Sequence, residues 1–265
     1  MLSPSFSISP KDLWNAIATR SAPQVIDVRR RDAYEQSAQL LPGAIWCDAA
    51  KIGQWIGDLD PARPIAIACK AGHEMSQSAV AQLRADGIDA RVMEGGYEGW
   101  AKAGLPFVAK VELERFAPRR PKIDRIACPW LIRRFLDPHA RILFVDPDEV
   151  VNVARESGGV PFDIKDVELS HVGEHCSFDT MLRIFGLESE PSLARLALIV
   201  RGADTARYDI AEEAAGLHAV SLGLSALAGD DDHGLLERGF VVYDALFAWL
   251  RFAAEERHNW PAKAA

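Results

Sequence analysis

The sequence predicts an α/β domain in residues 1–108, a linker at 109–120 and a mainly α-helical domain in residues 121–265. The first half alternates short apolar runs, which are typical of buried parallel strands, with segments of helical spacing. The second half holds longer stretches of helical spacing and few strand signals. The boundary is indicated by a charge-rich segment between Pro106 and Pro121.

Local signals place the elements of the first half in order. Ser9 can N-cap a helix that has Pro10 in its first turn and Leu13 on its apolar face. Strands are expected at 24–28, at 44–46 after a turn, at 65–68 and at 91–93. Helices are expected at 30–35, at 76–85 and after Gly95-Gly96. This alternation predicts a parallel sheet covered by helices.

Cys69 lies where the apolar run 65–68 ends and a loop leads into the helix expected at 76–85. The backbone N–H groups and the dipole of a helix N-terminus favour a thiolate or a bound anion there. This position indicates a reactive thiol. The alternative is a buried, chemically quiet cysteine, because cysteine is common in protein interiors.

Four motifs in this order resemble the rhodanese domain over roughly residues 8–108. They are Val25-Ile26-Asp27-Val28-Arg29, Leu41-Pro42-Gly43-Ala44, the strand–Cys69–loop–helix segment, and Glu94-Gly95-Gly96 with Trp100 and Ala103-Gly104-Leu105-Pro106. The resemblance implies a five-stranded parallel sheet with helices on both faces and Cys69 as the carrier of a persulfide sulfur. It implies a small-molecule sulfur donor or oxyanion and a thiol acceptor as partners, with Asp27 mainly architectural.

The loop departs from the common sulfurtransferase pattern in length and charge. It has seven residues from Cys69 to Met75, where six are usual, and it lacks the usual final arginine. The longer loop resembles that of the phosphatase branch, which also needs an arginine for its oxyanion. The expected anion-binding residues are Lys70, Ala71, Gly72, His73, Glu74, Met75 and Ser76. Without a guanidinium partner, thiosulfate is expected to be a poor donor.

The second half is expected to be helical at 193–199, at 208–227 and in a final helix that Asp232 can N-cap, with a strand at 142–145. The basic stretch between Arg115 and Arg125 is expected to be a solvated linker.

Several motifs resemble the C-terminal domain of the chromate-resistance protein (ChrB) family over roughly residues 120–252. They include the segments 122–135, 161–163, 167–179, 199–205 and 231–246. The resemblance implies a role in chromate resistance. Regulators of this family carry a different N-terminal part, so a DNA-binding role is not carried over. From residue 109 on, acidic side chains outnumber basic ones, which also predicts no nucleic-acid partner.

A metal site is a further hypothesis for the second half. His233, Glu237 and Asp244 fall at i, i+4 and i+11, which places them within about 40° on one helix face. Apolar neighbours suggest that this face turns inward, where ionisable groups need a partner. With His171 and Asp204 as ligands from other segments, the residues His171, Asp204, His233 and Glu237 would hold one divalent ion, Zn, Mn or Fe. Ordinary polar packing is the alternative.

Together, these features predict a cytoplasmic rhodanese-type sulfurtransferase linked to chromate resistance. The alternatives are a redox enzyme whose Cys69 attacks chromate, and a non-catalytic sensor of an oxyanion or metal. The 265-residue chain has a net charge of −8 and four cysteines without CxxC spacing, which fits a reducing compartment. No apolar run is long enough to cross a bilayer, and residues 1–14 have no signal-peptide pattern, so no membrane partner is expected.

Overall fold

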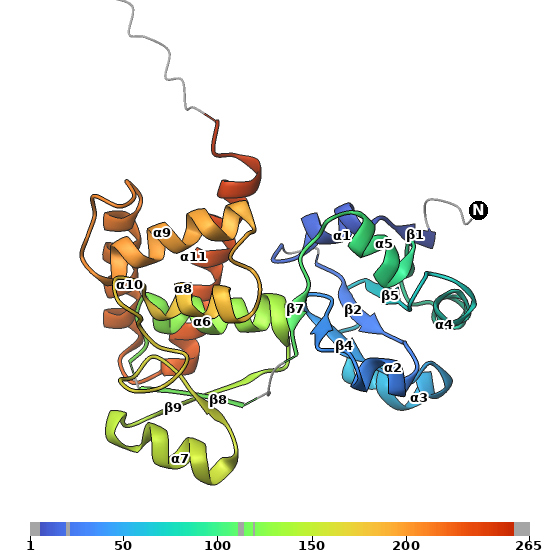
Figure 1. The fold of residues 1–265 in the computed structure, drawn as a ribbon, viewed down its shortest axis with the longest axis horizontal. Helices are drawn as coiled ribbons and strands as arrows, with labels where there is room; N and C mark the ends of the chain where they lie inside the picture. The colour runs from blue at the N-terminus through green and yellow to red at the C-terminus, as the bar shows by residue number, and fades with distance from the viewer. Residues whose placement is uncertain (1–5, 20–21, 111–113, 119, 257–265) are drawn as a thin grey trace, which may run out of the picture.

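The computed structural model describes residues 6–19, 22–110, 114–118 and 120–256 of the chain, arranged in two lobes (Figure 1). The first lobe is built on a five-stranded sheet in the order β1-β6-β5-β2-β4. Its strands are β1 (Ser7–Ile8), β2 (Gln24–Asp27), β4 (Ala44–Trp46), β5 (Ile65–Ala68) and β6 (Ala90–Met93). All the neighbours are parallel, with Ile26 opposite Ile67 in the central pair. The expected five-stranded parallel sheet is therefore confirmed.

Alternate side chains of strand β5 enter the two layers on either side of this sheet. Ala66 and Ala68 pack in a cluster with residues of α1 (Pro10–Ala16) and α5 (Gly96–Lys102). Ile65, Ile67 and Cys69 pack in a second cluster with residues of α3 (Ile52–Trp55) and α4 (Glu74–Ala85). Helices therefore cover both faces, as expected.

The helix ends in the first lobe show how sequence sets the boundaries. The Ser9 side chain accepts a hydrogen bond from the backbone N–H of Asp12, so it caps α1 as expected. Helix α2 (Arg31–Glu35) follows strand β2. Helix α4 begins at Glu74, two residues earlier than expected, because His73 is already its N-cap residue. The non-helical part of the loop after Cys69 is therefore shorter than expected from the sequence.

The second lobe is a helical assembly around α6 (Asp124–Leu131), which continues as a π-helical segment over Ile132–Leu136. Helices α8 (Ser177–Ile184), α9 (Pro191–Asp204), α10 (Ala214–Ala228) and α11 (Asp232–Phe252) complete it. Trp130 of α6 is fully buried, with ring centroids of Phe135, Tyr243 and Phe247 5.5 to 6.1 Å away. This aromatic cluster is the centre of the helical core.

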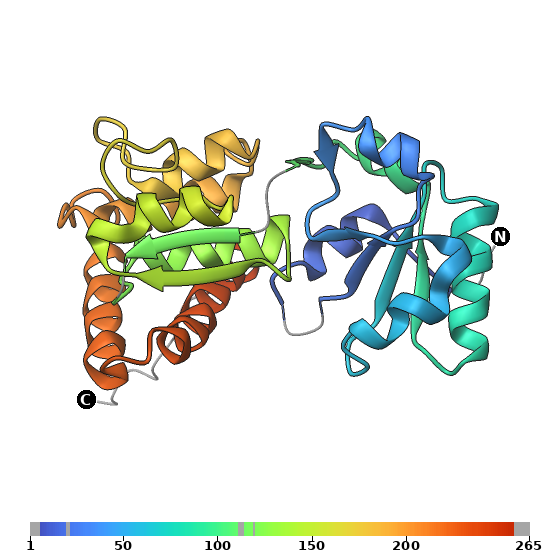
Figure 2. The ribbon, with the colours of Figure 1, turned by 90° about the horizontal axis from the view of Figure 1, so that it is seen from below.

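A small parallel sheet lies beside these helices (Figure 2). Its order is β10-β8-β9, from β8 (Glu114–Pro118), β9 (Arg141–Val145) and β10 (Val160–Pro161), and α7 (Val150–Ser157) packs against it. The expected strand at 142–145 is confirmed as β9. The linker expected at 109–120 is wrong in part, because residues 114–118 form a strand of this sheet, while 111–113 and 119 lie outside the described residues.

Three smaller expectations in the second half also need correction. The helix expected at 208–227 begins at Ala214, and Asp231 rather than Asp232 caps α11 by accepting from the N–H of Gly234. The basic stretch was expected to be a solvated linker, but Arg125 donates to the buried carboxylate of Asp163.

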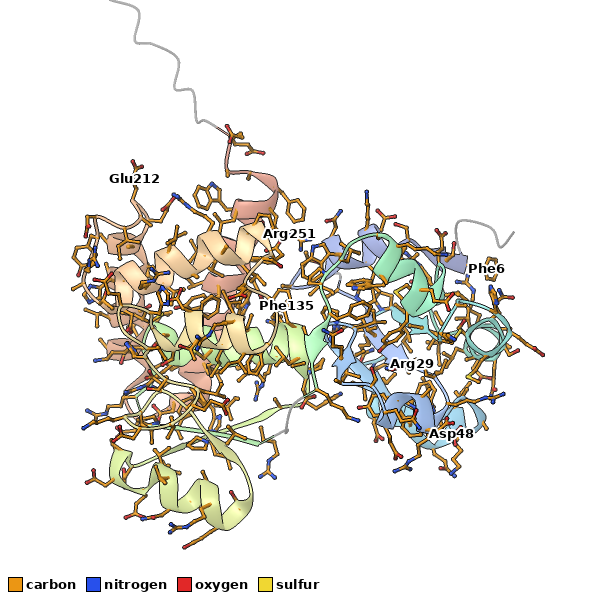
Figure 3. All side chains as sticks on the ribbon, viewed as in Figure 1. Phe6, Arg29, Asp48, Phe135, Glu212 and Arg251 are labelled. Atoms are coloured by element: carbon orange, nitrogen blue, oxygen red, sulfur yellow. The ribbon has the colours of Figure 1, made fainter. Side chains whose placement is uncertain are left out.

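The two lobes share one continuous apolar core. The ring centroids of Phe135 and Trp14 are 5.8 Å apart. The Phe135 carbonyl oxygen accepts a hydrogen bond from the backbone N–H of Gly43 at 2.7 Å. Arg251 of α11 donates to the carbonyl oxygens of Trp14 and Ile17. Figure 3 shows Phe135 and Arg251 where the lobes meet. These contacts fix the helical lobe against the lobe that holds the five-stranded sheet. Between the lobes, β7 (Val108–Ala109) pairs antiparallel with β3 (Gln39–Leu40).

Among the described residues, no helix combines the length and the apolar character that a bilayer span requires.

Candidate active-site loop and a second polar cluster

Cys69 directly follows strand β5 and faces the layer that contains α4. Its exposed fraction is 7%, so a narrow part of the residue reaches solvent. The Ser76 Oγ lies 3.2 Å from the Cys69 Sγ and 3.0 Å from the carbonyl oxygen of His73. The Ser76 hydroxyl can donate to either of them. A thiolate at Cys69 therefore has a neighbouring hydroxyl that can rotate toward it.

Burial raises the pKa of the Cys69 thiol, but hydrogen bonds that favour the thiolate outweigh this effect. The donors are the Ser76 hydroxyl and the backbone N–H groups of Ala71, His73 and Ser76, and together they hold the pKa below the ordinary value of 9.0. Burial, together with Asp58 and Asp27, raises the pKa of Cys47 to about 11. Burial also raises the pKa of Cys128 and of Cys176. Cys69 is thus the cysteine with the environment of a nucleophile.

Glycines allow this loop to pack tightly against the start of α5. A Cβ atom at Gly96 would overlap the carbonyl oxygen of Cys69, and Gly96 has a φ of +55°. The same carbonyl accepts from the N–H of Tyr97 at 3.0 Å. Gly72 has a φ of +70° and a Cβ there would lie 2.8 Å from the backbone nitrogen of Gly95. The loop is therefore held by backbone contacts that larger residues would prevent.

The remaining loop residues differ in position. Lys70 is exposed and lies 3.9 Å from Glu98, and His73 and Glu74 are also exposed. Met75 is half-buried against the cluster that contains Cys69. It also lines a cavity of about 620 Å³ together with Arg29, Arg30, Arg31, Lys51 and Cys47. Positive charge thus lies beside the loop even though the loop itself has no arginine.

We predict that Cys69 is alkylated fastest of the four cysteines. Because its pKa is below 9.0 and that of Cys47 is about 11, the rate at Cys69 should reach its plateau at lower pH than the rate at Cys47. Iodoacetamide labelling across a pH series, read by peptide mass spectrometry, measures both profiles. Faster labelling of Cys47 or Cys176 at neutral pH would contradict the prediction.

A second polar cluster lies in the helical domain around His171. The Nε2 atom of His171 is 3.3 Å from Asp124 Oδ2, 3.5 Å from Asp163 Oδ1 and 3.4 Å from Asp204 Oδ2. Hydrogen bonds with Asp124 and Asp163 raise the pKa of His171 to about 10. Burial raises the pKa of the Asp124 carboxyl to about 8. The cluster forms the inner wall of a cavity of about 970 Å³.

The structure brings together two of the four residues expected to bind metal, His171 and Asp204, and leaves the other two apart. His233 and Glu237 are exposed on α11, where Glu237 pairs with Arg133. The expected inward face was wrong because α11 buries Leu236, Phe240, Tyr243 and Phe247, an apolar stripe at i, i+4, i+7 and i+11. On that helix Asp244 accepts from Trp130 and Arg134.

Sequence reasoning did not select Asp124 or Asp163. Both lie in segments that resemble the ChrB family, at 122–135 and 161–163, and Asp124 is in the first turn of a helix. Neither has a regular spacing to His171, because the cluster joins loops and helix ends that are remote in sequence. The available signal was the presence of acidic residues in matched motifs whose neighbours are apolar.

Comparison with known proteins finds a separate family match for each half of the chain. Residues 9–103 match the family of rhodanese-like domains, and residues 117–250, just over half of the chain, match the ChrB C-terminal domain. The fold and the Cys69 loop define the first half as a rhodanese-like domain. The chain as a whole belongs to the family of the ChrB C-terminal domain, with that rhodanese-like domain before it.

Two curated relatives each match one half. Protein ChrB of Cupriavidus metallidurans is 36% identical over 130 residues, which are 47% of this chain and 37% of that protein. Thiosulfate sulfurtransferase GlpE of Actinobacillus succinogenes is 34% identical over 100 residues, 37% of this chain and 86% of that protein. The match thus spans little more than a third of the ChrB relative.

Solved structures with similarity to the chain include a rhodanese-related protein from Thermoplasma volcanium, 26% identical with a TM-score of 0.34. It covers 39% of this chain and 97% of its own. A rhodanese-like domain protein from Staphylococcus aureus is 28% identical with a TM-score of 0.32, and covers 36% of this chain and 90% of its own.

Proposed function

We propose that this protein is a rhodanese-type sulfur carrier that acts in chromate resistance. Cys69 would accept a sulfane sulfur as a persulfide and pass it to a thiol. The observation that carries the proposal is the group of donors around Cys69 Sγ, in which Ser76 and three backbone N–H groups hold the thiol pKa below its ordinary value. The link to chromate rests on membership of the ChrB C-terminal domain family.

The proposed transfer has two steps. In the first, the Cys69 thiolate attacks the outer sulfur of the donor, a new S–S bond forms, and the donor's S–S bond breaks with its electron pair going to the leaving group. In the second, an acceptor thiolate attacks the outer sulfur of the persulfide, and Cys69 leaves as a thiolate. No external oxidant is needed. The backbone N–H groups that hold the thiolate would also hold the terminal sulfur of the persulfide.

The site also suggests the size and class of the partners. Because Cys69 is 7% exposed, a small thiol acceptor fits better than a large protein surface. The thiolate requires a reducing compartment such as the cytoplasm, where disulfides are rare and all four cysteines would stay free, as they are in the structure.

Sulfur transfer to dithiothreitol or glutathione tests the proposal. The purified 265-residue protein is supplied with polysulfide or thiosulfate, and formation of sulfide or of the acceptor persulfide is measured. Catalysed transfer with at least one donor is the expected result. Consumption of chromate by the protein and thiol without any sulfur transfer would instead favour the redox function.

We predict that Met75→Arg improves the use of thiosulfate. The loop of this protein lacks the guanidinium that can pair bidentately with an oxyanion, so wild-type kcat/KM for thiosulfate should be low. The new arginine would supply that partner and should raise kcat/KM roughly tenfold, equivalent to about 1.4 kcal/mol. The increase should be specific to thiosulfate and absent with a sulfur donor that has no oxyanion group.

Met75→Gln is the matched control for side-chain polarity without charge, and it should leave thiosulfate use near the wild-type level. A wild-type rate that Met75→Arg does not improve would show that the backbone N–H groups and the nearby cations already bind the donor.

A further inference from the structure

The cluster around His171 brings together four side chains from three separate segments of the helical domain. Asp124 is in the first turn of α6 and Asp204 is the last residue of α9. Asp163 and His171 lie in the segment between strand β10 and helix α8. Three of the four side chains are strongly shielded, with exposed fractions of 4% for Asp124, 6% for Asp163 and 17% for Asp204.

The distances in this cluster are those of ligands around an ion. Oxygens of Asp124 and Asp204 lie 3.3 and 3.4 Å from Nε2 of His171, and the three ligand atoms all lie within 4.8 Å of one another. Ligand atoms on a tetrahedral ion with bonds of about 2.1 Å are about 3.4 Å apart. In the described part of the chain, Asp124, His171 and Asp204 form the one group of His, Cys, Asp or Glu residues whose ligand atoms are close enough to hold a metal ion.

The charged groups of the cluster are also compatible with a bound cation. Three carboxylates face one imidazole nitrogen, and that nitrogen carries at most one proton to share among them. Arg125 neutralises one carboxylate through its pair with Asp163. Because a histidine ligand binds metal in its neutral form, a bound ion would displace the imidazole proton and leave two carboxylates to be balanced. A divalent cation balances them.

Asp163 is held away from a ligand role by its other partners. Its Oδ1 accepts from the Ser177 hydroxyl at 2.6 Å, and its Oδ2 accepts from Arg125. Ser177 also links the two acids, since its backbone N–H donates to Asp124 Oδ2 at 3.3 Å. Such contacts fix the orientation of a metal site from outside the ligand set. Asp163, Ser177 and Arg125 therefore act as positioning residues.

We infer that Asp124, His171 and Asp204 bind one divalent first-row metal ion, with a fourth position open to the adjacent cavity. One imidazole and two carboxylates suit a hard or borderline ion such as Mn²⁺, Fe²⁺ or Zn²⁺ better than a soft one. The cavity of about 970 Å³ gives the ion a path of entry and room for water or a further ligand. An open position is typical of metal sites that act on a ligand rather than only hold the fold.

The test uses the 265-residue protein after treatment with a chelator. Mn²⁺ and Zn²⁺ are added separately, bound metal is counted by elemental analysis after equilibrium dialysis, and the thermal midpoint is recorded with and without the ion. About one ion per chain and a rise in the midpoint are expected. His171→Ala and Asp204→Asn should each weaken binding roughly 100-fold or more, given that loss of outer contacts alone costs 10- to 100-fold.

Two controls locate the ion. His175→Ala removes an exposed histidine four residues from His171 and should bind metal as the wild type does. Cys69→Ser should also bind normally, because the site does not use the active-site thiol; this separates the metal site from the proposed sulfur transfer. Circular dichroism checks that each variant is folded, and Asp204→Asn, at a partly exposed helix end, serves if His171→Ala does not fold.

Several results would overturn the inference. They are a chain that binds less than about a tenth of an equivalent of either ion, folded Asp204→Asn protein with wild-type affinity, or loss of the ion in Cys69→Ser.

Discussion

Cys69→Ser should lower the rate of sulfur transfer by roughly a thousandfold or more, because it removes the nucleophile that carries the sulfur. The substitution replaces sulfur by oxygen in a side chain that is 7% exposed, so the fold should be retained. A serine hydroxyl cannot form a persulfide and is not ionised at neutral pH. The assay compares transfer from polysulfide to dithiothreitol in the variant and the wild type.

Cys47→Ser is the matched control for this experiment. Cys47 packs in the same apolar cluster as Cys69, but burial raises its pKa to about 11, so it should not carry sulfur. Transfer by this variant should stay close to the wild-type rate. If Cys69→Ser retains most of the activity while Cys47→Ser loses it, the chemistry belongs to Cys47 and its cavity instead.

Asp27→Ala should destabilise the protein by about 3–5 kcal/mol, the cost of leaving one partner of a buried ion pair unpaired. Asp27 is fully buried, and both its oxygens bond to Arg29, whose guanidinium carbon lies 3.6 Å from the centroid of the Tyr97 ring. The Tyr97 hydroxyl also donates to Asp27 at 2.8 Å. The free energy of unfolding, measured by urea titration, gives the loss directly.

Asp32→Ala is the control, since Asp32 is exposed on α2, and it should change stability by about 0.5 kcal/mol or less. A loss of less than about 1 kcal/mol for Asp27→Ala would contradict an architectural role. That result would instead favour a part for Asp27 in the reaction, to be tested by its effect on kcat.

The first domain could be predicted because its signals are local. The run 65–68 alternates isoleucine and alanine, and these side chains enter opposite layers of the sheet. Gly95 and Gly96 are visible in the sequence, and both have a positive φ that favours glycine. A side chain at Gly96 would collide with the backbone of the Cys69 loop. Helix α4 began earlier than expected because helix boundaries are set by capping, and His73 has no capping side-chain hydrogen bond that would mark it in sequence.

Other features depend on pairings between distant segments. Strand β8 at 114–118 pairs with β9 and β10, which lie more than 20 residues further along the chain, and its own residues are charged and end in Pro118. Such a strand has no local apolar run to identify it. Its segment therefore resembled a solvated linker until its partners were known.

The metal ligands expected on α11 were also wrong because their spacing along one helix does not reveal tertiary contacts. His233 and Glu237 share a helix face by spacing, but Leu236, Phe240 and Tyr243 form the stripe that the core uses. Both patterns are present in one sequence, and the apolar one determines the orientation because burial of large side chains outweighs a few polar contacts. His171 meets Asp124 and Asp163 through tertiary structure, which spacing along one helix does not reveal.

The central claim is that Cys69 carries sulfur, and the mass of the intact protein after reaction with polysulfide or thiosulfate tests it most directly. After removal of excess donor, the proposed function predicts a mass increase of one sulfur atom that peptide mapping places on Cys69, that dithiothreitol removes, and that Cys69→Ser lacks. An unchanged mass with both donors, or an added sulfur on Cys47, Cys128 or Cys176 in place of Cys69, would contradict it.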